Sequence, residues 1–165
     1  MVDETEFRDA YRQLNEIPCP FKKAIFSTVC ACSRNERLYI GDREVLSCRS
    51  PAAQQRCLTL LGHLREVARF MLKVTSGRGE WPHAKRMKVE TGGLLGLKAV
   101  IAPESGHPGH VEDVHDLLDQ AKAEFETLAV LPYPRILQEM ARFKPRSRRS
   151  RNKRDWPQMN ADRRR

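Results

Sequence analysis

The feature that most constrains this chain is the position of its cysteines. All five, Cys19, Cys30, Cys32, Cys48 and Cys57, lie within residues 19–57, and none follows in a chain of 165 residues. Thiols that only fill a hydrophobic core would be scattered along the sequence. Thiols confined to one segment indicate a common centre, such as a metal ion, an iron–sulfur cluster or a redox pair. We therefore expect residues 19–57 to form a metal or redox segment.

The spacing of these cysteines argues against the usual zinc knuckle, in which about two to four residues separate a pair of ligands. The closest pair is Cys30 and Cys32, with one residue between them. Iron–sulfur clusters accept more varied spacing, provided that four thiolates converge. Cys19-Pro20 also matches the Cys-Pro dipeptide at the end of bacterial ferredoxin motifs. We therefore expect an iron–sulfur cluster as the cofactor, with zinc as the alternative.

A site of four thiolates needs one cysteine fewer than this segment supplies. The sequence favours Cys30, Cys32 and Cys48, and it leaves Cys19 and Cys57 to compete for the last place or to contribute together. The competing interpretation is that the thiols are buried and inert, because free cysteine is a good small hydrophobe. Cys57 in particular falls on the apolar side of an expected helix.

Charge within the cysteine segment also suits an anionic centre. From residue 19 to residue 57 the sequence has seven lysines and arginines against three acidic residues, a surplus of four positive charges. Cys48 precedes Ser50-Pro51, a good start for a helix, where unpaired amides and the positive end of the helix dipole favour a thiolate. Both features would stabilise thiolate ligands.

The formal net charge of +9 belongs to the C-terminal end of the chain. Residues 142–165 contain 11 lysines and arginines and two aspartates, whereas residues 1–141 contain 19 side chains of each sign. Residues 144–165 have little to bury, so we expect a disordered basic tail. Residues 142–165 would bind an acidic protein partner or nucleic acid through salt-sensitive contacts, or else serve only solubility.

Hydrophobic spacing predicts a mainly α fold: a single, mostly helical domain over residues 1–143, with a short β-hairpin in its cysteine-rich N-terminal part. Residues 21–29 are compatible with a short helix or an extended segment, and the glycine-rich residues 92–101 with a short helix or a strand that permits close packing. Apolar periodicity predicts helices over residues 3–15, 51–74, 111–130 and 134–143, and short strands over 38–40 and 43–46 around Gly41-Asp42.

Other sequence signals are weak. His107, His110 and His115 lie near acidic residues and form a second, poorer candidate for a metal site, because His107-Pro108-Gly109-His110 is typical of a loop, whereas a helical zinc motif needs its histidine pair on a helix. No phosphate loop, nucleophile elbow or internal repeat is present, so no enzymatic activity is predicted. No apolar run is long enough to span a membrane, and no secretory signal or transit peptide is evident. We therefore expect a cytoplasmic protein with reduced cysteines.

Two functions follow from these expectations. The first is a small cytoplasmic iron–sulfur or redox-thiol protein that transfers electrons or assists a larger enzyme system, and docks a partner through its basic tail. The second is a zinc-stabilised accessory protein that binds nucleic acid. The identity of the metal separates them.

Overall fold

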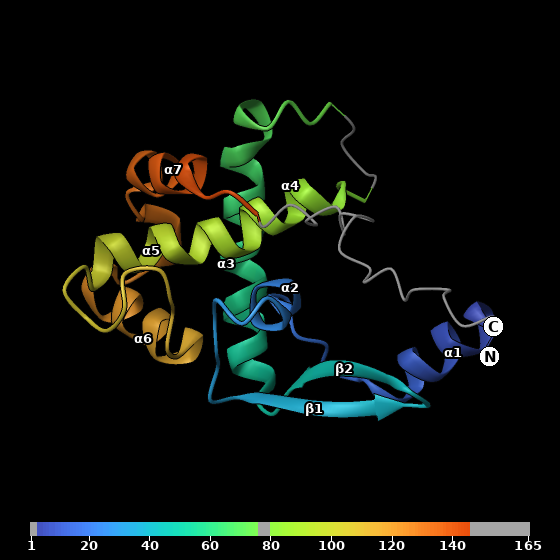
Figure 1. Cartoon of the computed structure of the whole chain (residues 1–165). Helices are drawn as coiled ribbons and strands as arrows, with labels where there is room; N and C mark the ends of the chain where they lie inside the picture. The colour runs from blue at the N-terminus through green and yellow to red at the C-terminus, as the bar shows by residue number, and fades with distance from the viewer. Residues whose placement is uncertain (1–2, 76–79, 146–165) are drawn as a thin grey trace, which may run out of the picture.

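The structure is a computed structural model that describes residues 3–75 and 80–145. Nearly all of the predicted tail over 144–165, including its expected disorder, lies outside these residues. The prediction of a mainly helical fold with a short hairpin is confirmed (Figure 1). The elements are α1 (Glu4–Leu14), α2 (Lys22–Phe26), β1 (Asn35–Ile40), β2 (Arg43–Cys48), α3 (Pro51–Met71), α4 (His83–Met87), the π-helix η1 (Lys88–Gly92), α5 (Gly93–Ile101), α6 (Val114–Phe125), the 3-10 helix η2 (Leu128–Val130) and α7 (Tyr133–Arg142).

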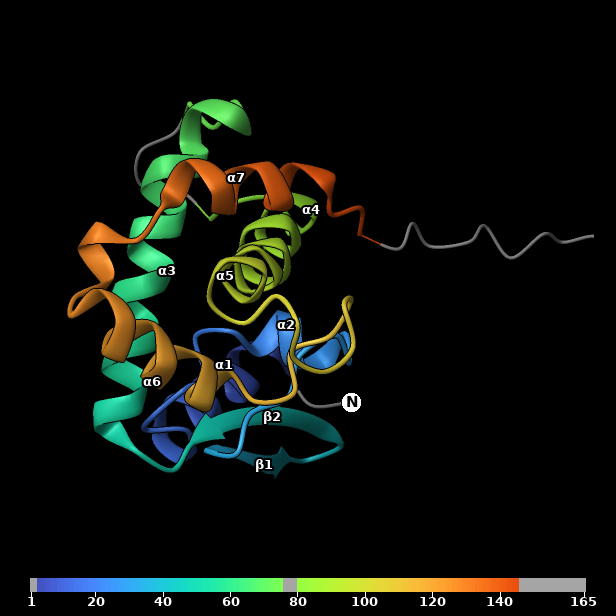
Figure 2. The ribbon, with the colours of Figure 1, turned by 90° about the vertical axis from the view of Figure 1, so that its left-hand side faces the viewer.

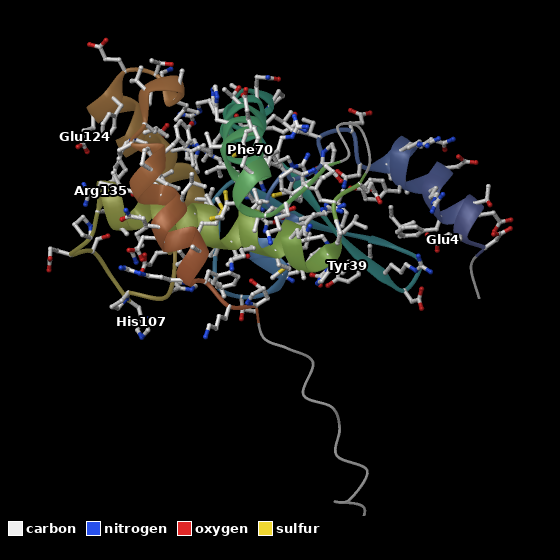
Figure 3. The ribbon with its side chains drawn as sticks, turned by 90° about the horizontal axis from the view of Figure 1, so that it is seen from above. Glu4, Tyr39, Phe70, His107, Glu124 and Arg135 are labelled. Atoms are coloured by element: carbon white, nitrogen blue, oxygen red, sulfur yellow. The ribbon has the colours of Figure 1, made fainter. Side chains whose placement is uncertain are left out.

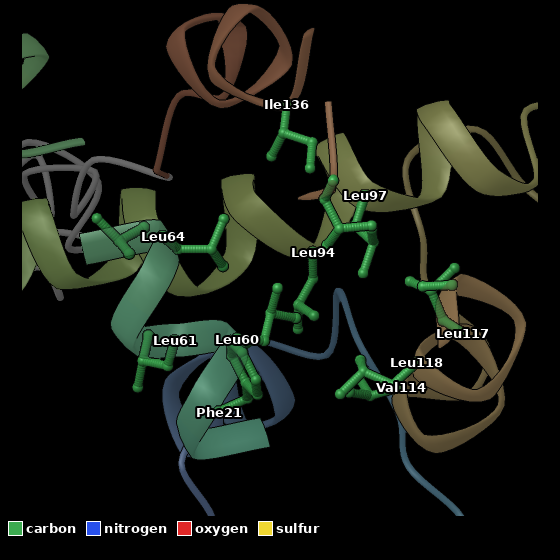
Figure 4. Close-up of a cluster of buried hydrophobic side chains, with 14 of the residues drawn as sticks. Phe21, Leu60, Leu61, Leu64, Leu94, Leu97, Val114, Leu117, Leu118 and Ile136 are labelled. Atoms are coloured by element: carbon green, nitrogen blue, oxygen red, sulfur yellow. The ribbon is translucent and has the colours of Figure 1, made fainter. Parts of the chain in front are cut away.

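The long helix α3 organises the fold. The hairpin and α2 lie at its N-terminal end, while α5 crosses it with α6 and α7 on either side (Figures 1 and 2). Leucines from α3 and α5 meet Ile136 of α7 in the core, all of them fully buried (Figure 4). Within residues 3–75 and 80–145, none of the helices combines the length and the apolar character needed to cross a membrane.

The hairpin is longer than the sequence predicted. Its antiparallel register pairs Ile40 with Arg43 across the turn and Asn35 with Cys48 at the open end. Gly41 occupies the turn with a φ of 62°, a conformation that glycine adopts without strain. The base of the hairpin therefore lies beside one of the candidate cysteines.

Helix α3 begins where the sequence predicted. The Ser50 hydroxyl accepts a hydrogen bond from the Ala53 amide at 3.2 Å, and Pro51 occupies the first turn. The helix ends at Met71 rather than near residue 74, because Lys73 adopts a left-handed backbone with a φ of 51°.

Residues 92–101 are largely helical, which resolves the choice that the sequence left open. The helical stretch starts earlier than predicted, because His83 is the first residue of α4. Helix α4 continues through η1 into α5 without a break. Helix α4 has only five residues, three of them polar, and lacks a capping side chain, so apolar spacing did not reveal it.

Gly96 allows α5 and α7 to pack closely, as the glycine-rich sequence suggested. A Cβ atom at Gly96 would lie 2.7 Å from the carbonyl oxygen of Ile136. That atom belongs to the backbone of α7 and cannot turn aside. Any side chain at this position therefore forces the two helices apart.

Helix α6 is shorter than predicted at both ends. Its cap is Asp113, whose carboxylate accepts a hydrogen bond from the His115 amide at 3.0 Å. Val111 pairs with the segment around Cys30 and so cannot join the helix. Glu126, with a φ of 62°, ends α6 ahead of η2.

We predict that Gly96→Ala lowers the free energy of unfolding by about 1–3 kcal/mol, because the added methyl group overpacks the α5–α7 contact. Gly62→Ala is the matched control: Gly62 lies within α3, and its added Cβ would meet no atom within 4 Å. Alanine should stabilise α3 there by about 0.5–1 kcal/mol. Urea unfolding of both variants measures the difference; equal effects would refute the close contact.

Candidate functional site

Cys19 and Cys48 are brought together by the segment that precedes α2. This segment runs along β2, with an isolated antiparallel bridge between Pro18 and Ser47. The Cys48 amide donates to the Ile17 carbonyl at 2.7 Å, and the Cys19 amide donates to the Leu46 carbonyl at 3.1 Å. These backbone bonds fix the two thiols on neighbouring extended segments.

Cys57 joins them from the second turn of α3. The same extended segment is tied to the start of this helix, because the Gln54 side-chain amide donates to the Pro18 carbonyl at 3.0 Å. Cys48 lies just before the helix, and its thiol donates to the Ser50 carbonyl at 3.3 Å. The N-terminal end of α3 therefore faces both extended segments.

Cys32 comes from a bend that packs against the start of α6. The Val111 amide donates to the Val29 carbonyl and the Ala31 amide to the Val111 carbonyl, each at 2.9 Å. The Ser33 amide donates to the Asp113 carboxylate at 3.0 Å. Residues on both sides of Cys32 are thus held by one short stretch of chain before α6.

Four of the five cysteines line one pocket, which we call the thiol pocket. Its free volume is about 20 Å³, little more than one water molecule needs, so a larger occupant requires the thiol side chains to turn apart. The pocket lining consists of the cysteines Cys19, Cys32, Cys48 and Cys57, the polar residues Arg34, Asn35, Ser47, Gln54, Arg56 and His115, and the apolar residues Pro20, Phe21, Ile25, Ala53, Val114 and Leu118.

Cys30 does not line the thiol pocket. It is 2% exposed and belongs to the hydrophobic core, paired through its backbone with Val111. Burial raises the pKa of the Cys30 thiol to about 12, and the nearby positive charge of Lys98 partly opposes that effect. The Cys-x-Cys pair thus sends one thiol into the core and the other into the pocket.

The pocket thiols also interact electrostatically with one another. Burial raises the pKa of Cys19 and of Cys57 to about 12 and also raises the pKa of Cys32. The pKa of each of these three thiols is raised further by the charge of other pocket cysteines, an effect that Cys30 does not experience. At neutral pH these thiols carry protons, and a bound metal would have to displace them.

Backbone amides act on two of the sulfurs against the effect of burial. The Phe21 amide lowers the pKa of Cys19, and the Arg34 and His115 amides lower the pKa of Cys32. Amide groups near sulfur stabilise a thiolate and tune a metal centre. The backbone around the pocket therefore offsets part of the cost of forming thiolates at Cys19 and Cys32.

A polar network forms one wall of the pocket. Arg56 pairs with Asp119 and also contacts His115 Nδ1 at 3.1 Å, while His115 Nε2 lies 3.4 Å from Asp119. The hydrogen bond from Arg56 holds the pKa of Asp119 below its usual value. The carboxylate thus fixes the cationic side chain of Arg56 beside the thiols.

The positive surplus predicted for residues 19–57 reaches the pocket only in part. Arg34 and Arg56 line it. Arg37 pairs instead with Glu44, and Arg43 pairs with Glu4 at 3.0 Å. Sequence counting could not separate these roles, since the hairpin carries two of the arginines away from the thiols.

The three candidate histidines do not form a site of their own. His107 lies on the exposed loop between α5 and α6 (Figure 3). The carbonyls of His107 and His110 accept hydrogen bonds from buried Lys98, so this stretch is a structural loop anchored by a lysine. Only His115 reaches the thiol pocket.

The thiols are not grouped as the ligands of a single metal ion are. Among residues 3–75 and 80–145, no three histidine, cysteine or acidic side chains are grouped closely enough to hold a metal ion. All five cysteines are free thiols. The thiol pocket thus gathers sulfurs into one lining without placing them at the ligand distances of a single ion.

Comparisons of this chain with protein families, with curated proteins and with solved structures find no match. The interpretation of the thiol pocket therefore depends on its own residues.

We predict that Asp113→Ala lowers the free energy of unfolding by about 1–2 kcal/mol, because it removes the cap of α6 and the acceptor for Ser33. Asp113→Asn keeps an oxygen acceptor and should cost less. Burial acts to raise the pKa of Asp113, but hydrogen bonds from Ser33 and His115 outweigh it and hold the pKa below its ordinary value.

A depressed folded-state pKa sets the sign of the pH dependence. The advantage of the wild type over Asp113→Asn should be full above the unfolded pKa of about 3.9 and disappear as pH falls through the folded pKa. Urea unfolding between pH 7 and about pH 3 measures this. An advantage that persists unchanged at the acidic end would contradict the proposed role of the carboxylate.

Proposed function

We propose that this chain is a small iron–sulfur protein whose cluster is held by Cys19, Cys32, Cys48 and Cys57. The observation that carries the proposal is the sorting of the thiols. Four come from separate segments and line one pocket, whereas Cys30 is buried elsewhere in the core. A core that used cysteine only as a small hydrophobe would have no reason to gather four.

The spacing of the thiols favours an iron–sulfur cluster over a zinc ion. Tetrahedral zinc needs sulfurs about 2.3 Å from one ion, hence only about 3.8 Å from each other. The side chains described are not grouped that tightly. In a cluster each thiolate can bind a different iron, which leaves the sulfurs farther apart. Four thiols lining a common pocket fit the wider arrangement after rotation of their side chains.

The surroundings of the pocket also suit a buried anionic cluster. Apolar side chains such as Phe21 and Leu118 limit the access of water, and Arg34 and Arg56 supply positive charge. The backbone amides of Phe21, Arg34 and His115 lower the pKa of the neighbouring thiols of Cys19 and Cys32. Low exposure, hydrogen bonds to sulfur and nearby charge are the features that set the potential of such clusters.

An electron-transfer or accessory role fits this pocket better than catalysis. Its free volume of about 20 Å³ is too small for an organic substrate, and a cluster would fill the space that opens when the thiols turn apart. A centre that exchanges only electrons needs no such space. Residues 142–165 lie almost entirely outside the described residues. The partner contact expected of them therefore stays a prediction within this proposal.

The experiment is anaerobic purification followed by an absorption spectrum and by iron and acid-labile sulfide analysis. We predict a brown protein that contains both. Replacing any one of Cys19, Cys32, Cys48 or Cys57 by alanine should remove most of the colour and iron, whereas Cys30→Ala should retain them. Cys30→Ala is the matched control because it deletes the same chemical group from the same segment.

Three results would overturn the proposal. A colourless protein with stoichiometric zinc supports the alternative, a zinc-stabilised accessory protein that binds nucleic acid. A metal-free protein whose four pocket thiols oxidise reversibly in pairs would instead support a redox-thiol function. Loss of colour in Cys30→Ala, with retention in Cys32→Ala, would show that the wrong thiols were assigned.

A further inference from the structure

Charge is distributed unevenly over the folded domain, although residues 1–141 are neutral in sum. The loop before α6 and the helix itself are acidic, with Lys122 the sole lysine or arginine in residues 104–126. The acidic residues of that stretch are Glu104, Glu112, Asp113, Asp116, Asp119, Glu124 and Glu126. The corresponding positive charge must therefore be concentrated in other parts of the domain.

One concentration lies where α2, α3, α4 and η1 meet, and we call it the basic face. Elements α2 and α4 contact each other, and both contact η1. Lys23 of α2 reaches His83 of α4, with 2.9 Å between Nζ and Nδ1. Lys85 of α4 donates to the Lys73 carbonyl beyond α3 at 3.3 Å. The basic face comprises Lys22, Lys23, Arg65, Lys85, Arg86 and Lys88.

Buried Glu90 offsets part of this charge: it pairs with Arg86 at 3.6 Å, lies near Arg65 and accepts a hydrogen bond from the Lys23 amide at 3.1 Å. Glu90 is 1% exposed and lies beneath the surface, and Glu80 also acts on Lys23. Burial, followed by repulsion from Arg86, lowers the pKa of Lys23. Cations crowded in this way present a surface that an external anion would stabilise.

The C-terminal basic residues begin beside this face. A Cβ built on Gly92, the last residue of η1, would lie 3.2 Å from Cβ of Phe143. Phe143 therefore lies next to the helix that starts at Lys88, and the sequence from Arg142 to Arg165 carries 11 lysines and arginines. Nine of the 11 are arginines, which suit bidentate contacts with phosphate.

We propose that the basic face binds the phosphate backbone of nucleic acid, and that the basic residues of the sequence 142–165 add contacts to the same phosphates. This goes beyond the cluster proposal, because none of the residues of the basic face lines the thiol pocket. A folded face with several cations, together with an arginine-rich sequence, matches a polymer of regularly spaced phosphates better than a limited acidic patch on a protein.

The test measures binding of the full chain to a fluorescein-labelled double-stranded DNA of mixed sequence by anisotropy at several salt concentrations. We expect binding that weakens steeply with salt. The triple variant Lys22→Gln, Lys85→Gln, Lys88→Gln should bind roughly tenfold more weakly. Its slope of log K against log salt should be shallower by about 2 to 3, at about 0.9 per lost phosphate contact.

The control is Arg37→Gln, Lys122→Gln, Arg135→Gln, which removes the same charge from exposed positions on β1, α6 and α7. It should keep nearly the wild-type affinity and slope. Equal losses in both triple variants would show a nonspecific effect of net charge and overturn the proposal. The proposal would also be overturned if the full chain did not bind DNA at low salt, or if it bound polyglutamate instead of DNA.

Discussion

The candidate site depends on backbone pairing between segments that are distant in the sequence. The segment before α2 lies on β2, and the bend after α2 lies against the chain that leads into α6. The first pairing sets Cys19 beside Cys48, and the second holds Cys32 against the start of α6. Cys57 then needs only the cap at Ser50 to set the start of α3. Without these main-chain bonds the thiols would have no common pocket.

The helical core supports this arrangement from the far side. Gly96 lets α5 approach α7, and buried leucines join α5 to α3. Lys98, at the end of α5, binds the loop that leads to Asp113 through the carbonyls of His107 and His110. The same loop carries the acceptor that fixes Ser33. Packing in the helical half is thereby linked to the position of Cys32.

Local sequence signals predicted the features that neighbouring residues determine, namely helix caps, turns and helical periodicity. The Ser50-Pro51 cap, the Gly41 turn and the apolar stripe of α3 could all be identified in the sequence, and each is confirmed. Helix α4 was missed because its polar residues show no periodicity. Its continuation into α5 depends on burial of η1 beneath α2, α3 and α7, which is a tertiary effect.

The cysteines show the same difference between what local sequence predicts and what tertiary contacts decide. Clustering in the sequence singled out the segment from which four thiols line one pocket, but spacing ranked Cys30 above Cys19 and Cys57. The structure places Cys30 in the core because its backbone pairs with Val111, a residue that no local pattern connects to it. The contribution of His115 to the pocket was likewise hidden, since α6 lies far along the chain.

The proposed function depends on the convergence of four thiols on one cluster, with Cys30 apart from them. The most direct measurement is a crystal structure of the anaerobically purified protein, with anomalous data collected at the iron edge. The account predicts one compact group of iron atoms bonded to the sulfurs of Cys19, Cys32, Cys48 and Cys57, with Cys30 remote. An absent iron peak, or one bonded to Cys30, would contradict it.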